Sequence, residues 1–206
     1  MRLFTAVYPS AEALDHLDLA LASVGGGYLA DSGGAVRWTP REQRHLTLAF
    51  LGDVTDGAVP EFLDCLETAI EGAQPLTLEL AGCGVFRESV LFAGVAEAGR
   101  ADLAALVNRA ARAVVEAGLP LDDRVGSRPH VTLARASRRA AARRRNHSGH
   151  GPDAGALFGD WARALSVYRG PAWTAQDVVV VSSELGAGPE GGPLHQELTR
   201  FPLGQH

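Results

Sequence analysis

The sequence contains one short phrase twice, as RHLTLAF at residues 44–50 and as PHVTLAR at residues 129–135. Both copies share the pattern His-x-Thr-Leu-Ala, although the whole chain has only seven histidines. The polar positions of the two copies are His45, Thr47, His130 and Thr132. A repeat of this kind predicts two similar lobes related by an internal pseudo-two-fold axis.

Both copies have the composition of a β-strand, in which successive side chains point to opposite faces. His45 and Thr47 should therefore share one face, roughly 6.6–6.8 Å apart along the strand. The side chains expected on the opposite, core-facing side are Leu46, Leu48 and Phe50 in the first copy and Val131 and Leu133 in the second. If the two copies face each other, two imidazoles and two hydroxyls line one pocket.

This set of groups suits a phosphodiester. A neutral imidazole can take a proton from an attacking water, and a protonated one can give a proton to a leaving oxygen. Threonine hydroxyls can donate hydrogen bonds to the non-bridging phosphate oxygens. The residues alone leave open which histidine plays which part. A purely structural repeat is the alternative, but packing rarely requires a solvent-facing histidine twice.

The remaining pattern of apolar residues alternates irregularly between strand and helix spacing. Strands are expected at 2–8, 36–38, 45–51, 76–82, 90–96, 130–135, 177–185 and 194–201. Helices are expected after Ser10, over 59–70 and over 103–114, with a short one near 157–165. Strands that follow strands as well as helices predict an α+β protein with mainly antiparallel sheets. We expect one bilobed domain over residues 1–206.

Composition narrows the classes of function. With 46% apolar and 21% charged residues the chain is an ordinary globular protein, and no apolar run is long enough to span a membrane. The net charge is −5, so a nucleic acid would have to bind at a local basic patch. Cys65 and Cys83 have neither metal nor disulfide spacing. We expect a cytoplasmic monomer with no metal.

Residues 136–156 are rich in arginine, glycine and alanine, and they predict a flexible insertion. The run Arg138–Arg145 is a candidate guide for an RNA backbone, with a solvated segment as the alternative. Arg128, just before the second motif, is a candidate phosphate contact, with a surface arginine beside a strand as the alternative. The sequence gives His195 no partner.

The motifs and their flanks resemble the 2H phosphoesterases, and more closely the RNA 2′,3′-cyclic phosphodiesterases, historically called 2′-5′ RNA ligases. The resembling stretches are MRLFTAVYPS, VRWTPREQRHLTLAFLGDV, GVFRESVLFAGV, SRPHVTLAR and VVVVSSELGAGP. The resemblance implies a bilobed α+β fold with helices outside and a central cleft between the motifs. It also implies hydrolysis of RNA or nucleotide 2′,3′-cyclic phosphates to 2′-phosphates, without a metal or other cofactor.

The resemblance also assigns roles. His45 corresponds to the proton donor, which protonates the departing 3′ oxygen, and His130 to the proton acceptor, which activates water. Thr47 and Thr132 would hold the phosphate. Two alternatives stay open: an enzyme that breaks or joins 2′-5′ bonds, and a nucleotide- or RNA-binding module without catalysis.

Overall fold

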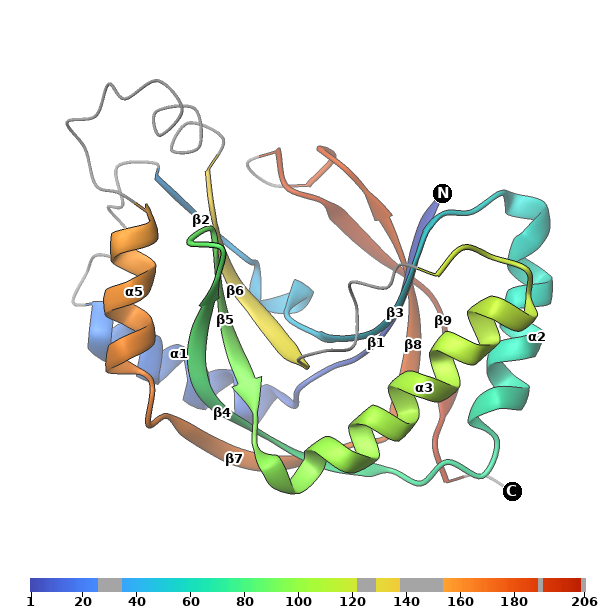
Figure 1. Ribbon diagram of the computed structural model, residues 1–206, viewed down its shortest axis with the longest axis horizontal. Coiled ribbons are helices and arrows are strands. Elements are labelled where there is room, and N and C mark those ends of the chain that lie inside the picture. The colour runs from blue at the N-terminus through green and yellow to red at the C-terminus, as the bar shows by residue number, and fades with distance from the viewer. Residues whose placement is uncertain (26–34, 122–128, 138–153, 189–190, 205–206) are drawn as a thin grey trace.

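The structure of the chain is a computed structural model that describes residues 1–25, 35–121, 129–137, 154–188 and 191–204 (Figure 1). Its strands are β1 (Arg2–Val7), β2 (Val36–Trp38), β3 (Leu46–Asp53), β4 (Leu76–Phe86), β5 (Val90–Val95), β6 (His130–Ala136), β7 (Arg169–Ala175), β8 (Asp177–Glu184) and β9 (Leu194–Pro202). Its helices are α1 (Ala11–Gly25), α2 (Val59–Ile70), α3 (Arg100–Glu116) and α5 (Ala154–Ala164).

The nine strands form one sheet in the order β7-β4-β5-β6-β3-β1-β8-β9, with β2 paired to β6, and every pair is antiparallel. Figure 1 shows the sheet bent into two halves. Helices α1 and α5 pack against β7 and β4 in one half, whereas α3, with α2 beside it, packs against β3 in the other. The predicted α+β fold with antiparallel sheets and outer helices is confirmed. No described helix is long and apolar enough to cross a membrane.

The two halves meet at the two motifs. In the described part of the chain, a single pair of Cα partners joins β3 to β6, and it consists of Leu46 and Val131, the middle residues of the two His-x-Thr units. Both side chains are fully buried. The motifs therefore lie side by side in one sheet and present their polar residues on the same face.

Both motifs contain a β-bulge between their threonine and their alanine, where the register with the neighbouring strand slips by one residue. The extra residue is Leu48 in β3 and Leu133 in β6. Each of these leucines is buried together with the alanine that follows it. Because a bulge re-aims the side chains around it, both leucine and alanine can face the core. This geometry explains why the repeat continues as Leu-Ala after the threonine.

The bulges correct one prediction. Strict alternation predicted that Phe50 faces the core with Leu46 and Leu48, and this was wrong, because the extra residue inverts the alternation. Phe50 instead lines a cleft and stacks on Phe4 with 6.2 Å between the ring centroids. The Thr5 hydroxyl supports the bulge in β3, since it is fully buried and accepts a hydrogen bond from the backbone N–H of Ala49 at 3.0 Å.

Other differences from the expected elements are local. Strand β7 was not predicted, because Gly170 and Pro171 disfavour a strand, but β7 lies at the sheet edge, where proline is tolerated. Strand β4 runs on to Phe86 and reaches β5 through a tight turn at Arg87 and Glu88, whose φ values are 47° and 55°.

The predicted insertion at 136–156 extended too far at both ends, since Ala136 is the last residue of β6 and α5 begins at Ala154. Residues 138–153, with the run Arg138–Arg145, lie outside the described residues. Arg128 lies outside them as well.

Candidate functional site

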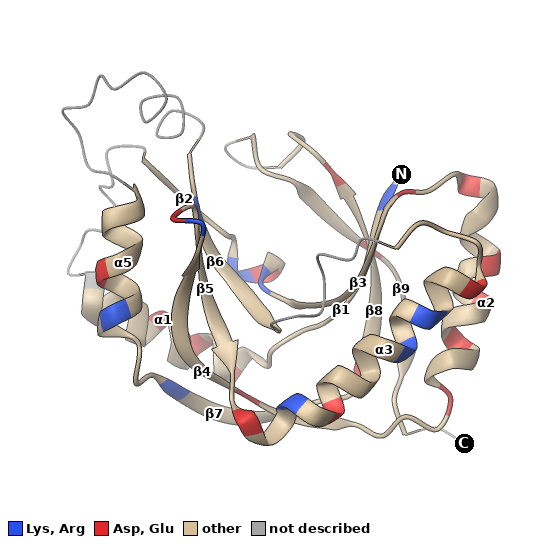
Figure 2. Ribbon diagram, in the orientation of Figure 1, with Lys and Arg blue, Asp and Glu red and all other residues tan. Residues whose placement is uncertain are grey.

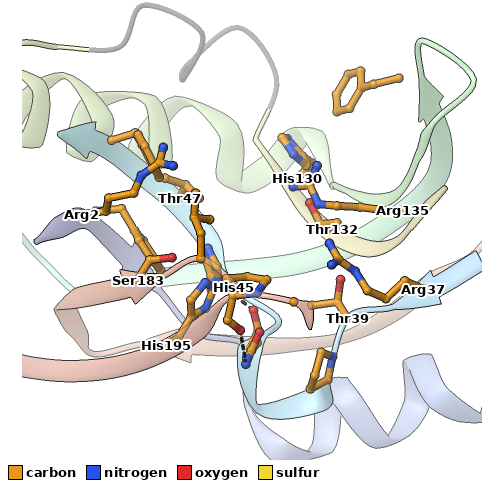
Figure 3. A pocket seen from close by; sticks show the side chains of 18 of the residues that line it. Arg2, Arg37, Thr39, His45, Thr47, His130, Thr132, Arg135, Ser183 and His195 are labelled. Atoms are coloured by element: carbon orange, nitrogen blue, oxygen red, sulfur yellow. Dashed lines mark hydrogen bonds between the residues drawn. The ribbon is translucent and has the colours of Figure 1, made fainter. Parts of the chain in front are cut away.

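A cleft of about 830 Å³ opens over the junction of the two halves. The structure brings both motifs together there, because the four polar residues predicted from the repeat all line it: His45, Thr47, His130 and Thr132 (Figure 3). The antiparallel register around the Leu46–Val131 pair sets each histidine next to the threonine of the other motif. The two histidines therefore occupy opposite corners of a four-residue group. In a regular antiparallel pair of strands, the Cα atoms of such diagonal neighbours are about 7–8 Å apart.

His45 is fixed by the segment that leads into β3. A short 3-10 helix, Arg41–Gln43, ends two residues before it, and the Gln43 carbonyl lies 2.7 Å from His45 Nδ1. A carbonyl oxygen can only accept, so Nδ1 carries a proton, and in the neutral ring Nε2 keeps the free electron pair. Gln43 is buried and donates from its side chain to the Pro193 carbonyl at 3.1 Å.

The environment of His45 favours its neutral form. Burial, with a smaller contribution from the positive charges of His195, His130 and Arg135, lowers its pKa from 6.5 to about 4, against the opposing effect of the Gln43 carbonyl. The protein by itself therefore holds His45 uncharged at neutral pH.

Aromatic rings from nearby strands of the sheet pack on each motif histidine. Phe4 of β1 stacks on His45 at 4.7 Å between ring centroids. On the other side, Phe92 of β5 and Phe86 of β4 meet His130 edge to face at 5.4 Å and 4.8 Å. These rings restrict the orientation of both imidazoles.

The packing around His130 depends on a glycine. Phe86 and Phe92 stack at 4.1 Å, and Gly84 lies opposite Phe92 across β4 and β5. A Cβ atom added to Gly84 would approach the tip of the Phe92 ring to 2.5 Å. The missing side chain therefore makes room for the ring that contacts His130.

The cleft concentrates positive charge in a chain whose net charge is negative. The arginines that line it are Arg2, Arg37, Arg87 and Arg135, and the described lining residues include no Asp or Glu. Acidic residues lie elsewhere, for example along α2 (Figure 2). A local basic surface of this kind attracts an anionic ligand.

Arg37 and Arg135 lie directly opposite each other on β2 and β6. Like charges in this position are destabilising in a sheet. Desolvation lowers the pKa of Arg135, and the charge of Arg37 lowers it further. A bound phosphate would relieve this repulsion, and arginine is well suited to bind one.

Arg135 was not predicted from the sequence as a site residue. It stands five residues after His130, as Phe50 stands five residues after His45. The bulge turns both of these positions toward the cleft. The signal available in the sequence was a charged residue near the end of the second motif strand.

His195 is a third histidine of the site that the sequence did not reveal. Its ring lies 5.5 Å from that of His45 and 5.0 Å from that of Phe4, edge to face in both cases. Burial lowers its pKa. It comes from β9, far from both motifs in the chain, and no local pattern marks it. Among the described residues, no three His, Cys, Asp or Glu side chains are grouped as metal ligands.

Two relatives bear the name RNA 2′,3′-cyclic phosphodiesterase. The one from Geobacillus stearothermophilus is 36% identical over 105 residues, which are 48% of this chain and 32% of the relative. The one from Aquifex aeolicus (strain VF5) is 32% identical over 103 residues, which are 48% of this chain and 54% of the relative. Each match thus spans about half or less of the relative's length.

Solved structures share the fold. The crystal structure of E. coli LigT complexed with NADP+ matches with a TM-score of 0.64 and 21% identity, over 99% of this chain and 98% of LigT. The crystal structure of TT0787 of Thermus thermophilus matches with a TM-score of 0.64 and 24% identity, over 98% of both chains. The family model described as the 2′-5′ RNA ligase superfamily matches residues 9–153, which are more than half of the sequence. The chain therefore belongs to the 2′-5′ RNA ligase superfamily.

Proposed function

We propose that the protein hydrolyses the 2′,3′-cyclic phosphate ends of RNA, or of small nucleotides, to 2′-phosphates. The observation that carries this proposal is the placement of two His-Thr pairs around one backbone contact, Leu46 to Val131, in a basic cleft. The names of the two relatives support the same reaction.

The arrangement supports an in-line displacement at phosphorus. The two histidines occupy opposite corners of the group, so one can serve the attacking water while the other serves the leaving oxygen. Thr47 and Thr132 occupy the other two corners, where their hydroxyls can donate to the non-bridging oxygens. Arg135, with Arg37 opposite, adds positive charge where the transition state gathers negative charge.

We assign His45 as the proton donor and His130 as the proton acceptor, as the family resemblance implies. His45 is neutral in the free protein at neutral pH, because its pKa is about 4. A bound phosphodiester brings a negative charge beside the ring, and such a charge raises the pKa of a histidine. His45 thus acquires its proton together with the substrate.

The description of the superfamily also names the joining of RNA. The same two histidines in the same roles would let a 5′ hydroxyl take the place of water: His130 would accept its proton, His45 would protonate the departing 3′ oxygen, and a 2′-5′ bond would form. We propose hydrolysis as the main reaction, since both curated relatives are named for it. We further propose that the protein acts as a monomer in the cytoplasm, a reducing compartment that suits its free cysteines Cys65 and Cys83.

The test is incubation with a short RNA that ends in a 2′,3′-cyclic phosphate, with the position of the product phosphate read by ³¹P NMR. The expected product is a 2′-phosphate, formed equally well in the presence of EDTA. A second reaction with an added 5′-hydroxyl RNA detects joining. Tight binding without turnover would instead identify a binding module, and strict dependence on a metal would contradict the proposed chemistry.

A further inference from the structure

We propose that the cleft contains a second anion subsite, formed by Arg2, Ser183 and His195, which binds the phosphate on the 5′ side of the terminal nucleotide. This inference rests on the proposed function and names a larger substrate for it: a nucleotide with a phosphate at its 5′ position, such as the last residue of an RNA strand.

The three residues form a row across adjacent strands. Arg2 of β1 is the Cα partner of Ser183 of β8, and Ser183 is in turn the partner of His195 of β9. Residues directly opposite each other in an antiparallel sheet share a face. All three line the cleft, and Figure 3 shows them on the side of His45 and Thr47.

Arg2 is held in place but lacks an anionic partner. Its guanidinium carbon lies 5.3 Å from the centre of the Phe50 ring, so the ring restrains the side chain. Its Nε atom is buried and has no hydrogen-bond partner in the described part of the chain. Within the described residues Arg2 makes no ion pair; Asp53 lies opposite it on β3 but is exposed and does not line the cleft. A buried donor of this kind is normally satisfied, and a bound phosphate oxygen would satisfy it.

Ser183 and His195 add neutral donors beside this charge. The Ser183 side chain faces the cleft, whereas the preceding Ser182 donates to the Gln196 carbonyl at 3.3 Å. His195 Nδ1 is buried and also lacks a hydrogen-bond partner among the residues that the structure describes. One arginine with a hydroxyl and an imidazole is a donor set that suits a phosphate.

The Arg2 end of the row lies away from the place of the reacting phosphate, whereas His195, whose ring lies 5.5 Å from that of His45, borders it. Arg2 stands four residues along β1 from Ala6, which is the partner of Thr47. Four residues of a strand span about 13 Å, so the Arg2 side chain begins well away from the motif and extends toward it. Arg37 and Arg135 lie on the other side, near Thr132 (Figure 3). The cleft therefore offers positive charge at two places, which fits a ligand with two phosphates.

The test compares the equilibrium binding of two ligands, adenosine 2′-phosphate and adenosine 2′,5′-bisphosphate, by titration calorimetry. The native protein is expected to bind the bisphosphate about tenfold more tightly, as expected for a few charge-assisted hydrogen bonds. Arg2→Gln should reduce this preference to about twofold or less, and Ser183→Ala should reduce it partly. Arg87→Gln, which removes the same charge from another part of the cleft wall, is the matched control and should keep the preference.

Equal affinity of the native protein for the two ligands overturns the inference. The inference is also overturned if Arg2→Gln lowers the affinity for both ligands equally, or if the native protein binds neither ligand. If Arg2→Gln does not fold, Ser183→Ala provides the same comparison. Binding is measured without turnover, so the subsite and the proposed function are tested separately. If the protein has no hydrolytic activity but prefers the bisphosphate in a way that depends on Arg2, the subsite is upheld and the proposed function is rejected.

Discussion

Leu46 and Val131 face each other as backbone partners, and this one contact holds the two motifs together across β3 and β6. Each is flanked by a histidine and a threonine that point the other way, into the cleft. Residues 85 positions apart in the chain thus form one group, because a fully buried apolar pair lies beneath them. The chemistry proposed for the site depends on this pairing.

Loss of either motif histidine should abolish most of the activity. His45→Ala and His130→Ala are each expected to lower kcat by at least the usual general acid–base factor of about 10²–10⁴. His16→Ala is the control, since His16 is exposed on α1, away from the cleft lining. Circular dichroism should show that the variants fold. Full activity in either motif variant would reject the mechanism.

The pH dependence of the rate should reveal the role of His45. Because kcat/KM reports the free enzyme, and the pKa of His45 there is about 4, a required proton on His45 makes the residual kcat/KM of His130→Ala, which no longer depends on His130, fall about tenfold per pH unit above that value. The matching fall in kcat should occur at higher pH, since the bound phosphate raises the pKa. If the residual kcat/KM of His130→Ala instead rises through pH 4 and then stays level, His45 is the acceptor.

Stability should also depend on pH through His45. Its pKa is lower in the folded state, at about 4, than the ordinary 6.5, so the unfolded chain binds the proton more readily between these values. The contribution of neutral His45 to the free energy of unfolding is fully present above pH 6.5. It decreases by about 3 kcal/mol as the pH drops toward 4. Urea unfolding of the native protein and of His45→Phe at pH 7 and pH 4.5 measures this term. An equal loss in both proteins would show that His45 does not contribute.

Gly84→Ala should disturb the site from a distance. The added methyl group would approach Phe92 to 2.5 Å and displace the ring that packs on His130. We expect a loss of about 1–3 kcal/mol in the free energy of unfolding, typical of overpacking, and a lower kcat. Gly57→Ala is the matched control, because nothing lies within 4 Å of its added Cβ. Unchanged kinetics in Gly84→Ala would show that the ring does not position His130.

The site residues within the motifs could be predicted from the sequence, because side chains of a strand alternate between two faces and His45 and Thr47 follow this alternation. The orientation of Phe50 could not be predicted, since a bulge that depends on the neighbouring strand reverses the alternation. Arg2 and His195 could not be predicted as residues of the cleft, for another reason. They join the cleft only through the pairing of β1, β8 and β9, and no local pattern encodes that order.

The two bulges have a consequence for how a substrate can lie in the cleft. They bring equivalent positions of the repeat into it, and these positions hold an aromatic ring, Phe50, in one half and a cation, Arg135, in the other. Two nearly identical motifs on their own would accept a ligand in either orientation. The divergence at this one position makes the ends of the cleft distinguishable, so directionality comes from the residues beside the motifs and not from the acid and base themselves.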